Sequence, residues 1–195
     1  AFARLIERKE NIGSSHSENI LYNSRILALG MQFSPMFEDE ISDDFIDTIE
    51  SSAGLHDIGK VMIPDSILLK NGPLTEEERK VIMTHAEIGA QTLIDIYDGT
   101  EYNDFVRMAI DIAWYHHENW DGSGYPKGLK GKEIPLSARI VKLVDVFDAM
   151  INQRRYRNAI PLDRTLAYIE ENAGIMFDPD IVRVFMKIYR NFHGI

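Results

Sequence analysis

The chain has 195 residues and no cysteine, and its 21 Lys and Arg residues against 31 Asp and Glu residues give a formal net charge of −10. This length suits one domain with its own core, and the lack of cysteine excludes disulfides and thiolate metal ligands. The negative charge disfavours binding to duplex nucleic acid, and no apolar run is long enough to cross a membrane. We therefore expect residues 1–195 to form one cytoplasmic domain without membrane contact.

The first residues, Ala1-Phe2-Ala3-Arg4, contain neither a starting methionine nor a signal-like apolar core. We interpret residues 1–15 as the end of an upstream linker or signalling helix. On this interpretation the chain is a fragment of a longer protein, with a regulatory sensor or receiver domain before it.

Helical periodicity runs through most of the chain and predicts an all-α fold. Clear start signals support the assignment: Ser42 or Asp43 can cap a helix, Thr75 and Glu78 can form a capping box, and Asp178-Pro179 is typical of a helix start. The glycines and prolines between residues 118 and 135 predict an ordered loop instead. The expected helices cover about residues 17–31, 42–56, 66–70, 75–93, 103–117, 137–153, 161–172 and 178–191.

Histidines and aspartates fall on the apolar faces of several of these helices, and two of them are adjacent, His56 and Asp57. A lone buried histidine is more often structural than functional, but several buried together with two acids are costly unless they share a metal ion. The candidate ligands are His16, His56, Asp57, His85, His116, His117 and Asp145. Seven ligands exceed the needs of one ion, so we predict two divalent ions bridged by Asp57, a centre that suits in-line attack at phosphorus.

An acidic protein that binds a phosphate needs positive charge near the site. Lys60 follows the adjacent His and Asp by three residues, and Arg139 and Lys142 precede Asp145 at spacings of three, which places them in one row on a helix. Arg154 and Arg157 come just after that helix. We predict that some of these residues contact phosphate, against the alternative that they are solvated surface charges.

The glycine-rich segment Asp121–Pro126 follows the histidine pair closely. Its glycines allow the backbone to approach a ligand, and Tyr125 offers a ring and a hydroxyl group. Glu118 could hold a ligand of the site in position, and Trp120 could stack there. A helix cap and a core aromatic are equally good interpretations, so neither residue is assigned a role.

Taken together, these residues resemble the signature of HD-GYP domains, a branch of the HD phosphohydrolases. The match covers about residues 10–185 and rests on His56-Asp57-Ile58-Gly59-Lys60, His85, His116-His117-Glu118, Asp121-Gly122-Ser123-Gly124-Tyr125-Pro126, Arg139-Ile140, Asp145-Val146-Phe147-Asp148-Ala149 and Arg154-Arg155-Tyr156-Arg157. The resemblance implies a helical bundle with additional C-terminal helices and a non-haem centre of two iron or two manganese ions. It also implies hydrolysis of cyclic di-GMP to pGpG or GMP.

The resemblance further implies roles for individual residues. His56, Asp57, His85, His116, His117 and Asp145 would bind metal, with Asp57 bridging. Lys60 would hold phosphate, as would Arg154 and Arg157. The segment Gly124-Tyr125-Pro126 would border the substrate pocket and contact a partner domain of the GGDEF type.

The N-terminal part departs from the family pattern. The family's histidine near the start, which His16 matches, is often preceded by a glutamate four residues earlier, where this chain has Ile12. The sequence therefore does not favour a third metal ion. The customary arginine three residues after the histidine is Asn19.

The first functional hypothesis is a phosphodiesterase in which a metal-bound hydroxide attacks phosphorus, with Asp57 and Lys60 as catalytic residues. A second hypothesis is a module that binds a cyclic dinucleotide or a partner protein without cleavage. A third is an HD phosphohydrolase for another nucleotide, including cyclic GMP-AMP. The nearly complete set of ligands, with the central six all present, favours the first.

Overall fold

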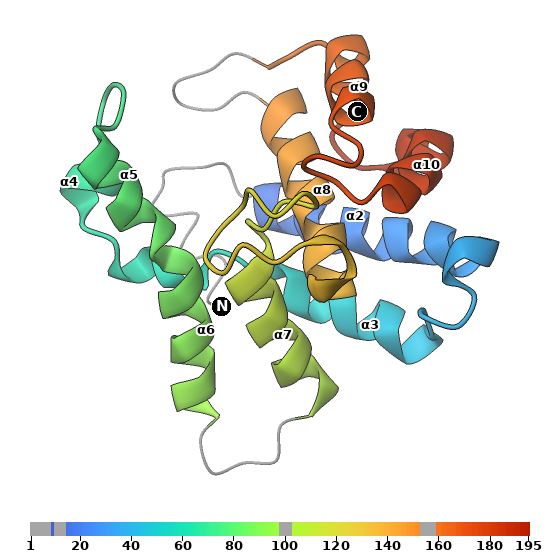
Figure 1. Ribbon diagram of the computed structural model, residues 1–195, viewed down its shortest axis with the longest axis horizontal. Coiled ribbons are helices and arrows are strands. Elements are labelled where there is room, and N and C mark those ends of the chain that lie inside the picture. The colour runs from blue at the N-terminus through green and yellow to red at the C-terminus, as the bar shows by residue number, and fades with distance from the viewer. Residues whose placement is uncertain (1–8, 10–14, 98–102, 153–158) are drawn as a thin grey trace.

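The computed structural model describes residues 9, 15–97, 103–152 and 159–195. Its regular structure in these ranges is helical, apart from an isolated bridge between Ala173 and Phe177, so the predicted all-α class is confirmed. The α-helices are α2 (Ser15–Gln32), α3 (Asp43–Ser52), α4 (Asp65–Leu68), α5 (Glu76–Met83), α6 (His85–Ile96), α7 (Asp104–Tyr115), α8 (Leu136–Ile151), α9 (Leu162–Glu171) and α10 (Pro179–Ile188) (Figure 1). Short 3₁₀ helices are η1 (Pro35–Phe37), η2 (Ala53–Leu55), η3 (Ile58–Met62), η4 (Gly131–Glu133) and η5 (Tyr189–Asn191).

The predicted helix starts agree with the observed capping contacts. The Ser42 hydroxyl accepts a hydrogen bond from the Phe45 amide at the start of α3, and Thr75 with Glu78 forms both bonds of the capping box at the start of α5. Each contact satisfies amides that have no partner inside their own helix.

One predicted helix was wrong, because residues 75–93 form two helices instead of one. The break is at Thr84, whose hydroxyl donates a hydrogen bond of 2.6 Å to the Val81 carbonyl. A threonine hydroxyl that bonds to the preceding turn competes with the backbone for that carbonyl. As a result, α6 begins with His85.

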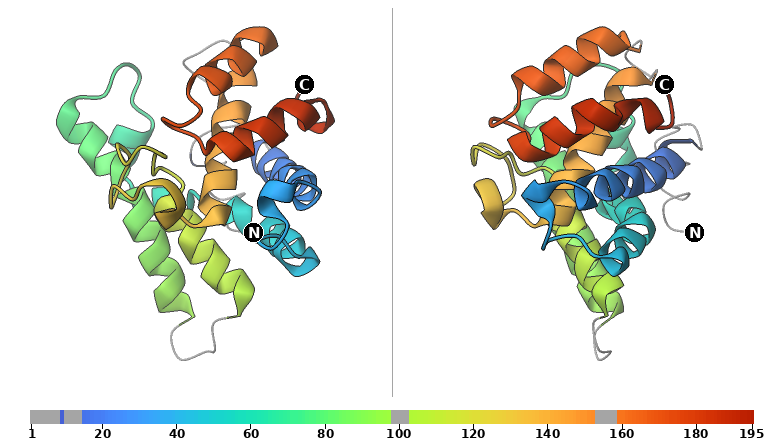
Figure 2. Two further views of the ribbon diagram at one scale, coloured as in Figure 1. Left: turned by 45° about the vertical axis from the view of Figure 1, so that its right-hand side comes forward. Right: turned by 90° about the vertical axis from the view of Figure 1, so that its right-hand side faces the viewer.

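The helices pack around α8, which contacts α2, α7 and α9. Figures 1 and 2 show α6 and α7 side by side as a pair that projects from the rest, with α9 and α10 at the opposite end. The main core joins α2, α3, α8 and α10 through fully buried side chains such as Leu27, Ile49, Phe147 and Phe185. A smaller cluster, which includes Ile58, fills the space between η3, α6 and α7.

Gly59 allows η3 to cross α6 at very short range. A Cβ atom at this position would lie 2.0 Å from the His85 carbonyl oxygen and 2.6 Å from the Gly89 amide nitrogen. Only glycine fits such a close approach of two backbones. The crossing places residues 56–60 directly against the first turn of α6.

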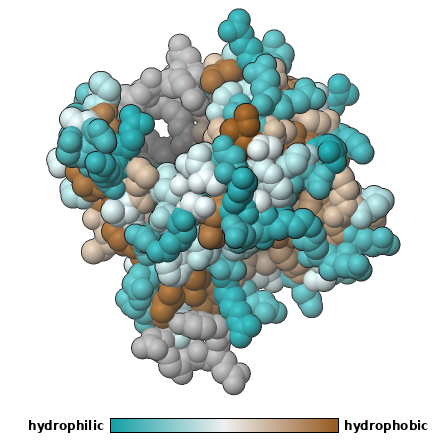
Figure 3. Space-filling model, in the orientation of Figure 1, coloured by the Kyte–Doolittle hydropathy of each residue, from teal (hydrophilic) through white to brown (hydrophobic). Residues whose placement is uncertain are grey.

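The exposed face in Figure 3 is mainly hydrophilic, with apolar side chains scattered over it. Large exposed apolar residues such as Phe33, Met62 and Ile195 lie far apart in the chain. None of the described helices has the length and apolar character that a membrane crossing requires. Residues 1–15, interpreted above as the end of an upstream helix, lie outside the described part except for Lys9 and Ser15.

Candidate metal centre

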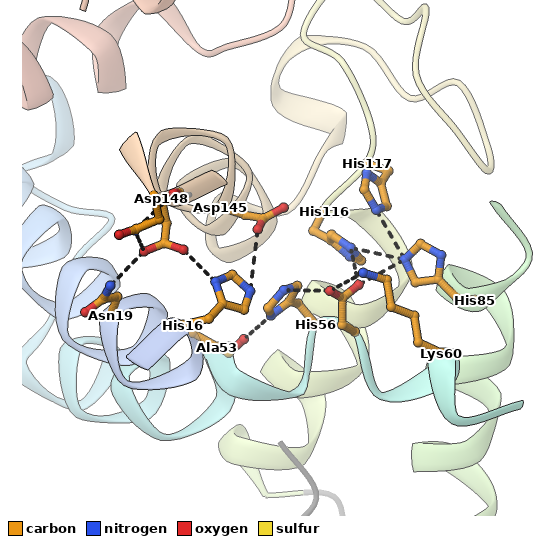
Figure 4. Close-up of polar contacts among 12 residues, drawn as sticks. His16, Asn19, Ala53, His56, Lys60, His85, His116, His117, Asp145 and Asp148 are labelled. Atoms are coloured by element: carbon orange, nitrogen blue, oxygen red, sulfur yellow. Dashed lines mark hydrogen bonds and ion pairs between the residues drawn. The ribbon is translucent and has the colours of Figure 1, made fainter. Parts of the chain in front are cut away.

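The seven predicted ligands come from five places in the chain and meet beside α8. His16 lies on α2, His56 and Asp57 lie between η2 and η3, and His85 begins α6. His116 and His117 follow α7, and Asp145 lies on α8. They form two groups in which the ligand atoms are within 4.8 Å of one another. One group is Asp57, His85, His116 and His117, and the other is His16, His56 and Asp145. Figure 4 shows the two groups next to each other.

Backbone carbonyls fix the orientation of three of the imidazoles. The Nδ1 atoms of His56, His85 and His116 lie 2.9, 2.6 and 2.9 Å from the carbonyl oxygens of Ala53, Ile82 and Ile112. Because a carbonyl oxygen only accepts hydrogen bonds, Nδ1 carries the hydrogen in each ring. The lone pair of each neutral ring is therefore on Nε2, which is the arrangement found in histidines that bind metal.

These Nε2 atoms face one another at distances that require a cation or a proton between them. His85 Nε2 is 3.4 Å from His116 Nε2 and 3.2 Å from His117 Nε2. Two nitrogen lone pairs at this separation repel each other. The buried Nε2 atoms of His16 and His56 likewise have no hydrogen-bond partner. Divalent cations would satisfy these atoms, so the residues fit a metal centre.

The Asp57 carboxylate lies between the two groups. Its Oδ1 is 3.3 Å from His85 Nε2 and 3.7 Å from His116 Nε2, while its Oδ2 is 3.2 Å from His56 Nε2. Its Oδ2 also accepts a hydrogen bond of 2.7 Å from Lys60. Burial alone would raise the pKa of this carboxyl. The charges of Lys60 and His56 act in the opposite direction, and the resulting pKa is well below its usual range. An ionised carboxylate with one oxygen toward each group has the geometry of a bridging ligand.

The pKa is raised for one histidine of the centre, His56, and lowered for two others, His116 and His117. Burial lowers the pKa of His56, but the charge and hydrogen bond of Asp57 together with the charge of Asp145 outweigh it and raise the pKa to about 9. Burial lowers the pKa of His116 to about 4 and that of His117 well below its usual value. Without a cation, the centre therefore keeps its positive charge at His56 beside Asp57. Metal binding must displace that proton.

Asp148 contacts the His16 ring nitrogen that does not face Asp145, a role that the sequence analysis did not assign. The His16 Nδ1 atom lies 2.6 Å from Asp148 Oδ2, and His16 Nε2 lies 3.9 Å from Asp145 Oδ1. Asp148 is 1% exposed, and its Oδ1 accepts hydrogen bonds of 2.8 Å from Asn19 and Asn152. Carboxylates in this position fix the tautomer and direction of a ligating histidine. The available signal was that Asp145 and Asp148 are three residues apart on one helix face.

Comparison with known proteins agrees with this centre. A family model described as HD domain matches residues 38–181. The chain belongs to the HD-GYP type of HD domain.

This HD domain is 39% identical to a cyclic di-GMP phosphodiesterase of Vibrio cholerae over 100% of the chain and 40% of that protein. It is 43% identical to a cyclic di-GMP phosphodiesterase of Thermotoga maritima over 76% of the chain and 39% of that protein. The chain thus spans about two fifths of the length of these relatives. A solved HDGYP protein from Bdellovibrio bacteriovorus matches with a TM-score of 0.64 at 19% identity, over 92% of this chain and 55% of that one. That match concerns the fold.

Glu118 holds the glycine-rich loop of the HD domain against the centre. Its carboxylate is 0% exposed and accepts backbone hydrogen bonds from the amides of residues 127–129 at 2.7, 3.1 and 3.1 Å. The Tyr125 ring stacks on His117 with 4.7 Å between centroids, and burial raises the Tyr125 pKa. A Cβ at Gly124 would lie 2.2 Å from the Asn119 amide nitrogen, so the loop can close only with glycine there. Sequence reasoning missed this role of Glu118, because its partners are backbone amides.

The basic residues predicted to contact phosphate differ in their surroundings. Arg139 is buried, donates 2.6 and 2.9 Å hydrogen bonds to Asp178 and the Ile134 carbonyl, and joins α8 to the start of α10. The Arg139 guanidinium is thus paired with Asp178, and its contact with phosphate stays a prediction. Lys142 is also buried and lines a small hollow together with Glu118, Arg139 and Asp178. Arg154 and Arg157 lie outside the described residues.

Proposed function

We propose that the protein to which this HD domain belongs hydrolyses cyclic di-GMP to pGpG, or further to GMP. The observation that carries the proposal is the convergence of three imidazole Nε2 atoms and a bridging carboxylate, next to a second group of three ligands. Relatives named as cyclic di-GMP phosphodiesterases support the choice of substrate.

We propose two divalent ions at the centre, iron first and manganese second, because imidazole and carboxylate ligands suit both. Such ions would lower the pKa of the attacking water and bind the phosphate oxygens. Each of the two ligand groups would hold one ion, with Asp57 shared between them. A third ion is not part of the proposal.

The protein's own groups would complete the reaction around these ions. Asp57 would position the two sides of the centre, and Lys60, whose amine is 2.7 Å from the Asp57 carboxylate, would neutralise charge that develops on the phosphate. Tyr125 would border the substrate, since its ring covers His117. Arg154 and Arg157 stay predicted phosphate contacts.

The wider setting is proposed on the same basis. The loop Gly124-Tyr125-Pro126 would contact a partner domain of the GGDEF type, and an upstream sensor or receiver domain would regulate the activity. A cytoplasmic location follows from the expected substrate. The competing functions are a module that binds without cleavage and a hydrolase for another nucleotide such as cyclic GMP-AMP.

The test is hydrolysis by protein loaded anaerobically with Fe(II) or Mn(II), with the metal content measured and the products separated by chromatography. Cyclic di-GMP and cyclic GMP-AMP are compared as substrates. Asp57→Asn is expected to lose activity, whereas the exposed control Asp163→Asn retains it. No turnover by wild-type protein with two bound metals would refute the proposal. Unchanged ligand affinity in His56→Ala and Asp57→Ala would then favour the binding module.

A further inference from the structure

A pocket of about 430 Å³ lies between α3, α7 and the start of α8, and its lining residues include none of the seven candidate metal ligands. Of these elements, α7 contacts both α3 and α8 (Figure 1). Phe45, Met108 and Leu136 give the pocket an apolar wall, and they also pack against the main core. The size and the mixed lining are typical of a site for a small molecule.

The start of α8 lines this pocket and has hydrogen-bond donors without a partner in the described ranges. Pro135 is the N-cap residue and offers no side-chain acceptor, and the first bond of the helix joins the Arg139 amide to the Pro135 carbonyl. The amides of residues 136–138 therefore have no protein acceptor there, at the positive end of a 16-residue helix. Ser137 lines the pocket and is 4% exposed, and its hydroxyl makes no hydrogen bond within the same ranges. Such a group of donors favours an anionic part of a ligand.

Asp111 and Arg107 bring one charge of each sign from α7 to the same pocket. Among the residues that the structure describes, neither side chain has an ion-pair or hydrogen-bond partner. Asp111 is half-buried, and burial raises the pKa of its carboxyl. A partly buried carboxylate without a partner is stabilised by a ligand that donates hydrogen bonds to it, whereas a guanidinium without a carboxylate partner is suited to phosphate.

Two further carboxylates at the pocket, those of Asp44 and Asp104, do not exclude an anionic ligand. Both residues are exposed, and they stand in the first turns of α3 and α7. A first-turn carboxylate is offset by the positive end of its own helix, and solvent screens an exposed charge. Asp111 lies in the middle of α7 and has no such compensation. The pocket therefore offers an acceptor at Asp111 and donors at the start of α8 and at Arg107.

We propose that this pocket binds a guanine mononucleotide such as GMP, apart from the metal centre. Guanine has two adjacent donors, N1–H and the N2 amino group, and the Asp111 carboxylate accepts both. The apolar wall covers the flat base, and the phosphate lies at the start of α8 with the Ser137 hydroxyl and Arg107. An amino acid also carries an anionic and a donating group, but it has no flat apolar body to fill a pocket of this volume.

The proposed function supplies a source for this ligand, since hydrolysis of cyclic di-GMP yields guanine nucleotides. The site itself does not depend on that reaction, because its residues differ from the metal ligands. A bound product at this place would be held by α8, the helix that also carries Asp145.

The experiment measures the binding of GMP, AMP and guanosine to the metal-loaded protein by isothermal titration calorimetry. AMP tests the contact of the base with Asp111, because adenine has an acceptor where guanine has N1–H, and guanosine tests the phosphate contacts. The variants are Asp111→Asn and Arg107→Gln, with the exposed residues in Asp163→Asn and Arg79→Gln as matched controls. Metal content and circular dichroism establish that each variant is loaded and folded.

The wild type should bind GMP about tenfold or more tightly than AMP, and Asp111→Asn should raise the Kd for GMP by about tenfold to a hundredfold, the loss of hydrogen bonds to a charged group. Arg107→Gln should weaken the binding of GMP and leave that of guanosine unchanged. Both controls should match the wild type.

Three results would overturn the inference. They are a wild type that does not bind GMP, equal affinity for GMP and AMP, and binding of GMP that Asp111→Asn leaves unchanged, which would place the nucleotide at the metals. Because the measurement needs no hydrolysis, a failure to cleave cyclic di-GMP would refute the proposed function alone, and the binding data would still decide the inference.

Discussion

Replacing Lys142 by methionine is expected to stabilise the protein. A fall in the Lys142 pKa from 10.5 to about 8 corresponds to about 3 kcal/mol of free energy against the charged side chain in the folded state. Methionine has a similar length and no charge to desolvate. We expect the free energy of unfolding at neutral pH to rise by about 1–3 kcal/mol, which raises the Tm of a domain of this size by about 2–4 °C per kcal/mol.

The pH dependence of this gain follows from the direction of the pKa change. The folded protein releases the Lys142 proton near pH 8, whereas the unfolded chain holds it up to about pH 10.5. Between these values the unfolded state binds more protons, so the stability of the wild type rises with pH. The difference between Lys142→Met and wild type should therefore be greatest below about pH 8 and should shrink as the pH approaches 10.5. Groups common to both proteins cancel in this difference.

The assay is urea unfolding of both proteins at neutral pH and at about pH 9.5, within the range where the wild-type lysine loses its charge. Lys187→Met serves as the exposed control and should change stability by about 0.5 kcal/mol or less. Bound metal at Asp145 would remove one of the charges that attract the amine and should enlarge the gain. A destabilised Lys142→Met, or a gain that is the same at both pH values, would refute the conclusion that burial lowers the Lys142 pKa.

Three further substitutions test contacts around the centre, through metal affinity for one and through the free energy of unfolding for the other two. Asp148→Asn should weaken the hold on His16 and lower metal affinity by about 10- to 100-fold, as measured by competition with a chelator. Gly59→Ala should lower the free energy of unfolding by about 1–3 kcal/mol or more, because its Cβ would lie 2.0 Å from a carbonyl oxygen of α6. Arg139→Met leaves Asp178 buried without its cation and should cost about 3–5 kcal/mol in urea unfolding. The second change Asp178→Asn should restore much of this loss, because asparagine removes the charge and keeps an oxygen that accepts from the Asp180 amide at the start of α10.

Each of these expectations has an outcome that contradicts it. Unchanged metal affinity in Asp148→Asn would show that His16 is oriented without this carboxylate. Full stability of Gly59→Ala would show that η3 and α6 can separate without loss. A folded Arg139→Met variant with a raised KM for cyclic di-GMP would return Arg139 to the substrate site.

Local sequence signals were sufficient for most of the helices and for grouping the candidate metal ligands. Capping residues such as Ser42 and Thr75 act within one turn, so they can be read from neighbouring positions. The inward direction of His85 and Asp145 follows from helical periodicity, and the cost of burying several such groups indicated a shared cation before any contact was known. The helix break at Thr84 was not predicted, because a threonine can also continue a helix.

The tertiary structure alone decided what each charged side chain does. Arg139 and Lys142 lie three residues apart on one helix and had the same prediction. Arg139 donates a hydrogen bond to Asp178, 39 residues later, whereas Lys142 is buried and makes no ion pair within the described ranges. Glu118 likewise acquired a role only when backbone amides of the loop folded onto it. Periodicity indicates which face of a helix is buried. The partner found on that face depends on long-range packing, which a single sequence does not contain.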